Sequence, residues 1–153
     1  MSNLYQTDIA LWAEQQAQLL RCFARYGPAF FPLYANEQID WENIAREIQD
    51  VAKSEQSEIE DLLVVLCAHL LKWRFQPSRR SPSCRGSIVE ARNGIARVIR
   101  NSPSLKDHPD KVLAEAYPNG RRLAQAEGKL TKPPTECPWP VGQMLQHDFW
   151  PEN

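Results

Sequence analysis

The sequence has no apolar run long enough to cross a membrane. Its longest such run, Leu62–Leu71, is about half of the ~20 residues that a membrane-spanning helix needs, and it contains His69. The first ten residues lack the basic and apolar regions of a secretory signal peptide. The four cysteines are scattered and include no C-x-x-C pair, which favours reduced thiols. We therefore expect a cytoplasmic protein that does not enter a membrane.

The sequence also lacks a charge excess and the common catalytic motifs. Its net charge is -1, which leaves nucleic-acid binding open but does not favour it. It contains no G-x-S-x-G, P-loop or dinucleotide fingerprint, and its three histidines have no companions at metal-ligand spacing. We expect no cofactor and no metal. The 42% hydrophobic content excludes a disordered chain, and 153 residues suit a single domain over 1–153.

Helical periodicity dominates the first half of the chain. Thr7 or Asp8 is a suitable N-cap for a first helix that we expect to end at Gly27–Pro28. An apolar connector then leads to Asp40, the predicted N-cap of a second helix, with Ile39 and Ile44 as a hydrophobic staple. No Gly or Pro follows until Pro77, which predicts one helix of about 35 residues. Its predicted apolar stripe is Ile44, Ile48, Val51, Ile59, Leu62, Leu66, Leu70 and Trp73.

Two further helices and an arm complete the predicted fold. Ser81 as N-cap and Pro82 at the first position begin a third helix that extends to about Ile99. A capping-box-like turn over 104–107 precedes a fourth helix from about Pro109 to Gly128, kinked at Pro118. Residues 131–153 are rich in proline but also apolar, which predicts an extended arm docked on the helices. The predicted class is all-α: a bundle of about four main helices with a long central second helix.

Opposite charges occupy two adjacent stretches of the chain. Residues 37–61 hold nine acids and two bases, whereas residues 72–100 hold eight bases and one acid. One interpretation is that the second and third helices fold against each other and pair these charges. Exposed pairs of this kind contribute only about 0–1 kcal/mol each, so they would select the pairing more than stabilise it.

The other interpretation places an anion-binding basic corner at residues 72–85. A helix start offers free N–H groups and the positive end of the helix dipole, and arginine forks bind phosphate or carboxylate. Tryptophan adds a face on which a base or an arginine stacks. The candidate anion- or partner-binding residues are Lys72, Trp73, Arg79, Arg80, Ser81 and Arg85.

A different hypothesis uses acidic residues of the second helix. Glu47, Asp50, Glu58 and Asp61 fall on one ridge, and paired carboxylates suit Mg²⁺. They would serve a metal-dependent phosphohydrolase. On one continuous helix, however, the two pairs lie about 16 Å apart, which favours a solvated acidic face.

Cys84 is the thiol that the sequence singles out. It follows an arginine pair near a helix start, which predicts a lowered pKa.

Several of these residues carry a resemblance to a known family. The chain resembles the bacterial domain-of-unknown-function family twenty-nine. The resemblance rests on Asn43–Asp50, His69-Leu-Leu-Lys-Trp73, Gln76-Pro77, Arg79-Arg80-Ser81, Ser102–Leu105, Ala114–Tyr117 and Cys137-Pro138. It implies an all-helical bacterial domain and brings no reaction, cofactor or catalytic residue. Two positions depart from the family pattern: Cys84 replaces an aromatic residue, and Pro118 interrupts a run usually free of proline.

We therefore expect a non-enzymatic cytoplasmic binding or protein-interaction module. Its partner would be a protein or an anionic ligand at the basic corner. Pairing with a second copy through the long helix stays open.

Overall fold

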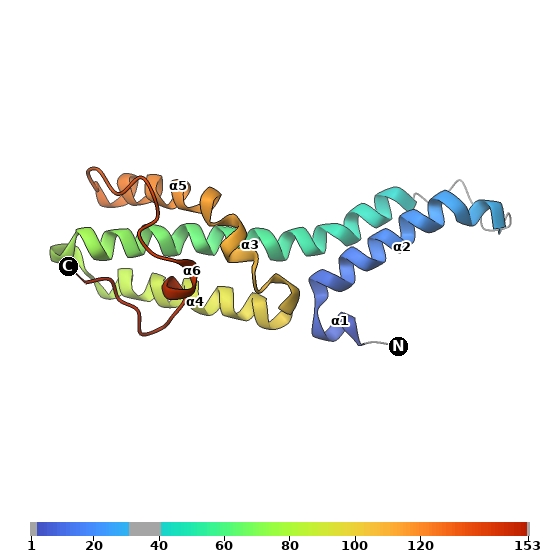
Figure 1. The fold of residues 1–153 in the computed structure, drawn as a ribbon, viewed down its shortest axis with the longest axis horizontal. Helices are drawn as coiled ribbons and strands as arrows, with labels where there is room; N and C mark the ends of the chain where they lie inside the picture. Colours follow the sequence, from blue (N-terminus) through green and yellow to red (C-terminus); the bar gives the residue numbers. More distant parts are fainter. Residues whose placement is uncertain (1–2, 31–40, 153) are drawn as a thin grey trace.

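The computed structural model describes residues 3–30 and 41–152, and Figure 1 shows their arrangement. The long helices are α2 (Ile9–Phe30), α3 (Trp41–Phe75), α4 (Pro82–Asn101) and α5 (His108–Gly128). The short elements are α1 (Leu4–Thr7), η2 (Pro77–Arg79), η3 (Pro103–Leu105) and α6 (Val141–Met144). Within the described residues there is no strand. The predicted all-α fold with four main helices is confirmed. The helix predicted as the second and longest is α3.

Helix α3 is the central element of the fold. Its N-terminal part pairs with α2, and its C-terminal part is flanked by α4 and α5 (Figure 1). The helix is unbroken across the polar run Lys53–Glu58, as predicted. Among the described residues, no helix combines the length and the apolar character needed to span a bilayer.

The buried face of α3 differs from the predicted stripe at its N-terminal end. Ile59, Leu66 and Leu70 are buried as predicted, but Ile44 and Val51 are 40% and 38% exposed. The neighbouring alanines, Ala45 and Ala52, are buried in their place.

The reason for this difference lies on α2. Its buried residues are also small: Ala10, Ala13 and Ala17. Because both helices present alanines to each other, their axes can approach closely, and the small residues of α3 rather than the large ones face α2. The prediction that Ile44 and Val51 belong to the core was wrong because it counted only large apolar residues.

The start of α2 was predicted correctly, but its end was not. The Leu11 amide donates to Asp8 Oδ1 at 2.9 Å, so Asp8 is the cap. The helix continues through Gly27 and Pro28 to Phe30. Gly27 has no positive φ, and a Cβ there would lie 2.8 Å from the Phe23 ring. Gly27 thus makes room for a side chain rather than ending the helix. The rest of the apolar connector, the Asp40 cap and the Ile39 staple lie outside the described residues.

Helix α4 begins as the sequence predicts. The Cys84 amide donates to the Ser81 hydroxyl at 3.1 Å, and Pro82 occupies the first turn. The turn after α4 differs from the capping-box-like turn predicted over 104–107. It is the 3-10 helix η3, Pro103–Leu105, and Ser104 is not its N-cap. Instead, Ser104 donates from its amide and its hydroxyl to the Asp8 carboxylate, at 2.6 and 2.9 Å. This contact is made across 96 residues, so the local capping pattern could not reveal it.

Helix α5 and the C-terminal arm close the core around α3. Helix α5 passes through Pro118 and ends at Gly128, as predicted. The arm, residues 131–152, buries Val141 and Met144 and packs Trp139, Leu145, Phe149 and Trp150 on the core. The predicted docked arm is therefore confirmed.

Candidate functional site

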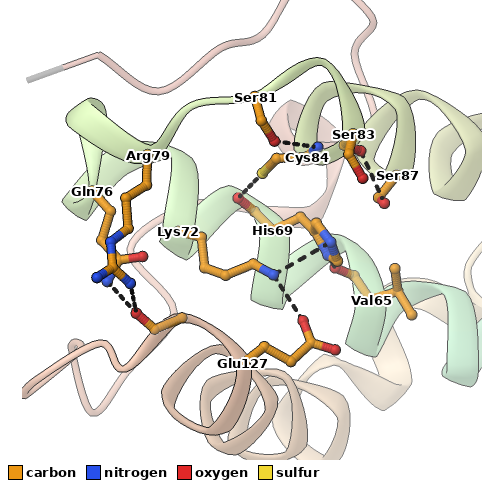
Figure 2. A network of polar contacts seen from close by, with 11 residues as sticks. Val65, His69, Lys72, Gln76, Arg79, Ser81, Ser83, Cys84, Ser87 and Glu127 are labelled. Atoms are coloured by element: carbon orange, nitrogen blue, oxygen red, sulfur yellow. Dashed lines mark hydrogen bonds and ion pairs between the residues drawn. The ribbon is translucent and has the colours of Figure 1, made fainter.

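A pocket lies where the end of α3, the start of α4 and the end of α5 meet (Figure 2). Its volume is about 220 Å³. Most of the lining residues are polar, and they are His69, Lys72, Gln76, Arg79, Ser81, Ser83, Cys84, Glu127 and Gly128. The corner between α3 and α4 therefore forms a concave polar site, with its third wall supplied by α5.

Lys72 and Glu127 form the ion pair of this pocket. Lys72 Nζ lies 2.7 Å from Glu127 Oε2 and 3.4 Å from His69 Nε2 (Figure 2). The hydrogen bond from Lys72 lowers the pKa of Glu127, so this carboxylate is ionised at neutral pH. The positive charge of Lys72 is thus already neutralised by Glu127.

Arg79 is the other basic side chain, and it is only partly used by the protein. One terminal nitrogen, Nη1, donates to the Gly128 carbonyl at 3.0 Å, beside a bond of 2.6 Å from Gln76. These two donors satisfy the carbonyl at the end of α5. Within the described residues, Nε and Nη2 of Arg79 make no hydrogen bond to the protein. The unused edge of the guanidinium is a donor pair suited to an oxyanion.

His69 is neutral in this setting. Its Nδ1 lies 3.0 Å from the Val65 carbonyl, so Nδ1 carries the proton and donates to it, while Nε2 accepts from Lys72. Burial lowers the pKa of His69, and the positive charge of Lys72 acts in the same direction. The imidazole therefore contributes no charge to the pocket at neutral pH.

Cys84 behaves differently from the prediction made for it. Burial raises the pKa of its thiol, and its Sγ lies 3.8 Å from the His69 carbonyl, to which the S–H donates. The helix start and the arginines do not outweigh this burial. Cys84 therefore lines the pocket as a protonated thiol and is not an activated thiolate.

The hydroxyl groups at the start of α4 have two roles. Ser81 accepts from the Cys84 amide as the N-cap. The Ser83 backbone carbonyl accepts from the Ser87 hydroxyl at 3.2 Å, and the Ser83 hydroxyl itself has no hydrogen-bond partner within the described residues. Ser83 therefore offers one free donor to the pocket at the positive end of a 20-residue helix.

The structure divides the six candidate residues into two groups. Lys72, Arg79 and Ser81 line the pocket, whereas Trp73, Arg80 and Arg85 do not. This second group forms a stack with Trp150 from the arm. The centres of the Trp73 and Trp150 rings lie 4.9 Å apart.

Arginines cover both rings of this stack. The Arg80 guanidinium lies over Trp73 at 5.1 Å from the ring centre, and its Nε donates to the Trp73 carbonyl at 2.9 Å. Arg85 lies over Trp150, also at 5.1 Å. These aromatic faces are therefore covered by arginines of the chain itself, and the six candidate residues lie on two sides of the corner.

The acidic ridge does not gather into a site. Glu47, Asp50 and Asp61 are exposed on α3, and Asp50 pairs with Lys53 at 2.7 Å. Glu58 pairs with Arg97 of α4, a contact of the kind that charge pairing between these helices predicts. In the described ranges, 3–30 and 41–152, no group of three or more His, Cys, Asp or Glu side chains could hold a metal.

Some pocket residues could not be found from the sequence because their place depends on tertiary packing. Glu127 and Gly128 lie about fifty residues beyond Lys72 and Arg79 in the chain, and no spacing pattern connects them. Gln76 is closer, but its role depends on the carbonyl of Gly128. Only the packing of α5 against α3 brings these groups together.

Comparisons with known proteins place the chain in a family. The model of a family described as "Domain of unknown function DUF29" matches residues 4–150. No curated protein matches the chain. A crystal structure of an alpha-helical protein of unknown function from Rhodospirillum rubrum is 22% identical, covers 97% of this chain and 93% of that one, and superposes with a TM-score of 0.68. That similarity shows a shared fold, and the family match over almost the whole length shows that the chain belongs to the DUF29 family.

Proposed function

We propose that this domain is a non-enzymatic cytoplasmic binding module that holds a small oxyanion, a phosphate or a carboxylate, in the pocket between α3, α4 and α5. The observation that carries the proposal is that Arg79, whose guanidinium is only partly used by the protein, lines the same cavity as Ser83 and the start of α4. These groups are donors, and together with Lys72 they make the pocket net positive despite Glu127.

The size of the pocket favours a small group. Its volume, about 220 Å³, is below the ~300 Å³ at which sites for drug-sized ligands begin. The oxyanion is therefore a free ion or the charged end of a larger partner that stays outside. Arginine binds such a group bidentately, and a helix N-terminus attracts it.

Two further observations support the proposed compartment and the proposed class of ligand. All four cysteines are free thiols, a state that a reducing cytoplasm would preserve. The aromatic faces of Trp73 and Trp150 are covered by Arg80 and Arg85, so they are not open to nucleobases. A protein or small-molecule oxyanion fits the corner better than a nucleic acid does.

The test is calorimetric titration of the purified protein with inorganic phosphate and with acetate. Arg79→Ala should lower the affinity for the bound anion by about tenfold, because the bidentate donor is lost. Arg97→Ala is the matched control: it removes an arginine that pairs with Glu58 on the surface and is absent from the pocket lining. Equal affinities for the wild-type protein and Arg79→Ala, or equal losses in both variants, would overturn the proposal.

A further inference from the structure

A second cavity, of about 370 Å³, lies between α5 and the start of the C-terminal arm. It shares no residue with the pocket described above. Its lining residues include Leu113, Tyr117 and Pro118 from α5 and Cys137 from the arm. Cys137 is half-buried, so its thiol forms part of the wall of an open cavity.

Cys137 belongs to a cluster of sulfur atoms. Cys67 on α3 is fully buried in the core cluster against which Cys137 packs, and the two thiols interact. On another side, Cys137 Sγ lies 3.7 Å from the sulfur of Met144, which is also fully buried. The Tyr117 hydroxyl closes the wall by donating to the Pro134 carbonyl at 2.8 Å. One thiol thus faces the cavity and a second thiol lies directly behind it.

A glycine permits this arrangement. A Cβ at Gly120 would lie 2.6 Å from Cys67 Cβ and 2.8 Å from the Val64 carbonyl. Only glycine therefore lets α5 approach α3 closely enough to keep the cavity wall next to Cys67. Gly120 thus allows the close contact between α5 and α3 beside Cys67.

The two thiols differ in acidity. The interaction with Cys67 lowers the pKa of Cys137 despite its partial burial. The same pairing and deep burial raise the pKa of Cys67. Cys84, by comparison, has a raised pKa caused by burial. Cys137 is therefore the more nucleophilic thiolate, and Cys67 is a protonated neighbour.

We propose that Cys137 and Cys67 form an oxidant-sensitive site, in which a hydroperoxide that enters the cavity converts the two thiols into a disulfide. The Cys137 thiolate attacks one peroxide oxygen, the O–O bond breaks, and a sulfenic acid and hydroxide (for an alkyl peroxide, an alkoxide) form. Cys67 sulfur then attacks the sulfenic sulfur; the S–S bond forms and the S–OH oxygen leaves as water with the Cys67 proton. Two thiols lose two electrons in all, and the peroxide gains them.

The consequence is a covalent link between the arm and α3. Cys67 lies in the middle of the bundle core, and Cys137 lies just before α6. The disulfide would anchor the arm that carries Trp139, Met144 and Trp150 to the core. Cellular thiols would reverse the link by exchange at the more exposed sulfur, which belongs to Cys137.

The experiment treats the fully reduced protein with hydrogen peroxide at neutral pH and maps disulfides by mass spectrometry of unreduced peptides. It uses a Cys22→Ala background, because Cys22 is exposed and would form links between chains. The expected product is a Cys67–Cys137 bond. In Cys67→Ala, the expected product is instead a sulfenic acid at Cys137 that a dimedone probe captures. Cys84→Ala is the matched control and should leave the Cys67–Cys137 bond unchanged.

A second measurement needs no variant in the core. Iodoacetamide should alkylate Cys137 about tenfold faster than Cys84 in the folded wild-type protein, because thiolate content controls the rate. Equal rates at the two thiols would overturn the proposal, as would peroxide treatment that leaves Cys67 and Cys137 reduced. Phosphate titration of the oxidised protein keeps this result separate from the proposed anion site, which contains neither thiol.

Discussion

The corner between α3 and α4 has two sides, and they use arginines from one short segment in different ways. On the pocket side, Arg79 lines the cavity and donates from one nitrogen to a backbone carbonyl. On the other side, Arg80 and Arg85 lie flat on tryptophan rings. The segment 79–85 therefore lines a pocket on one side and packs against tryptophan rings on the other. A cluster of arginines in the sequence therefore does not by itself indicate a binding site, because the groups that each arginine contacts decide whether it is available.

The C-terminal arm creates this difference. Trp150 lies at the end of the chain, yet it receives both Arg85 and Arg92, the latter at 5.2 Å from its ring centre. Arg92 is fully buried and donates to three arm carbonyls, those of Met144, His147 and Phe149. Its side chain thus holds the arm in place. The arm in turn covers the side of the corner that the pocket does not use.

The largest effect is expected where the arm is held. Arg92→Met should destabilise the protein by about 3 kcal/mol, because the buried Met144 carbonyl and two part-buried carbonyls of the arm lose a charged donor. Urea unfolding measures this change, and limited proteolysis should cleave residues 131–152 first. Arg97→Met, an exposed arginine of the same helix, should change stability by less than about 0.5 kcal/mol. Similar losses in the two variants would mean that the arm is not anchored by Arg92.

The next prediction compares the two sides of the corner through Arg80 and Arg79. Arg80→Ala should cost about 1–2 kcal/mol of stability, since it removes a ring contact and a hydrogen bond to the Trp73 carbonyl. It should leave anion affinity unchanged, whereas Arg79→Ala should lower affinity with little loss of stability. Thermal unfolding and calorimetry on both variants check this pair of outcomes. If Arg80→Ala weakened binding as strongly as Arg79→Ala, the division of the corner would be incorrect.

A smaller effect sharpens the electrostatics of the pocket. Glu127→Gln keeps the shape of the side chain but removes the negative charge beside Lys72. Anion affinity should rise by about fivefold, since a charge at this range near the surface contributes about 1 kcal/mol. Calorimetry at low salt measures the gain, and added salt should reduce it. A fall in affinity would show that Glu127 is itself needed for binding.

The smallest effect is a pH dependence of stability. Burial lowers the pKa of His69 below its ordinary value, 6.5, so on acidification the unfolded chain takes up the proton first. Stability should therefore decrease as the pH falls through about 6.5 toward the lower pKa of the folded state. Glu127, whose pKa is also lowered, would contribute only at more acidic pH, below its ordinary value.

His69→Gln should flatten this part of the stability curve between pH 7 and the lower limit of the window. Melting temperatures of the two proteins at several pH values provide the comparison. An equal slope in both proteins would rule out His69 as the titrating group.

Much of the fold could be predicted from local signals. The Ser81-Pro82 start of α4 and the absence of glycine and proline between Trp41 and Phe75 set helices that the structure confirms. Burial was harder, because Ala45 and Ala52 replaced Ile44 and Val51 at a contact that only the alanines of α2 explain. Apolarity alone does not report how closely two helix axes approach.

The candidate site was predictable only in part. Lys72, Arg79 and Ser81 are close in sequence to a helix start, and their placement in the pocket follows from that start. Glu127 comes from another helix, and Trp150 from the arm, so their effects depend on tertiary packing. The raised pKa of Cys84 has the same origin, because burial at the meeting of three helices outweighs the nearby positive charges.

The most direct test of the anion pocket is a crystal structure of the protein grown or soaked with tungstate, an oxyanion with a strong anomalous signal. The account predicts one main anomalous peak inside the pocket, within hydrogen-bond distance of Arg79 and the Ser83 hydroxyl. A peak on the Trp73–Trp150 side beside Arg80, or an empty pocket at saturating tungstate, would contradict it.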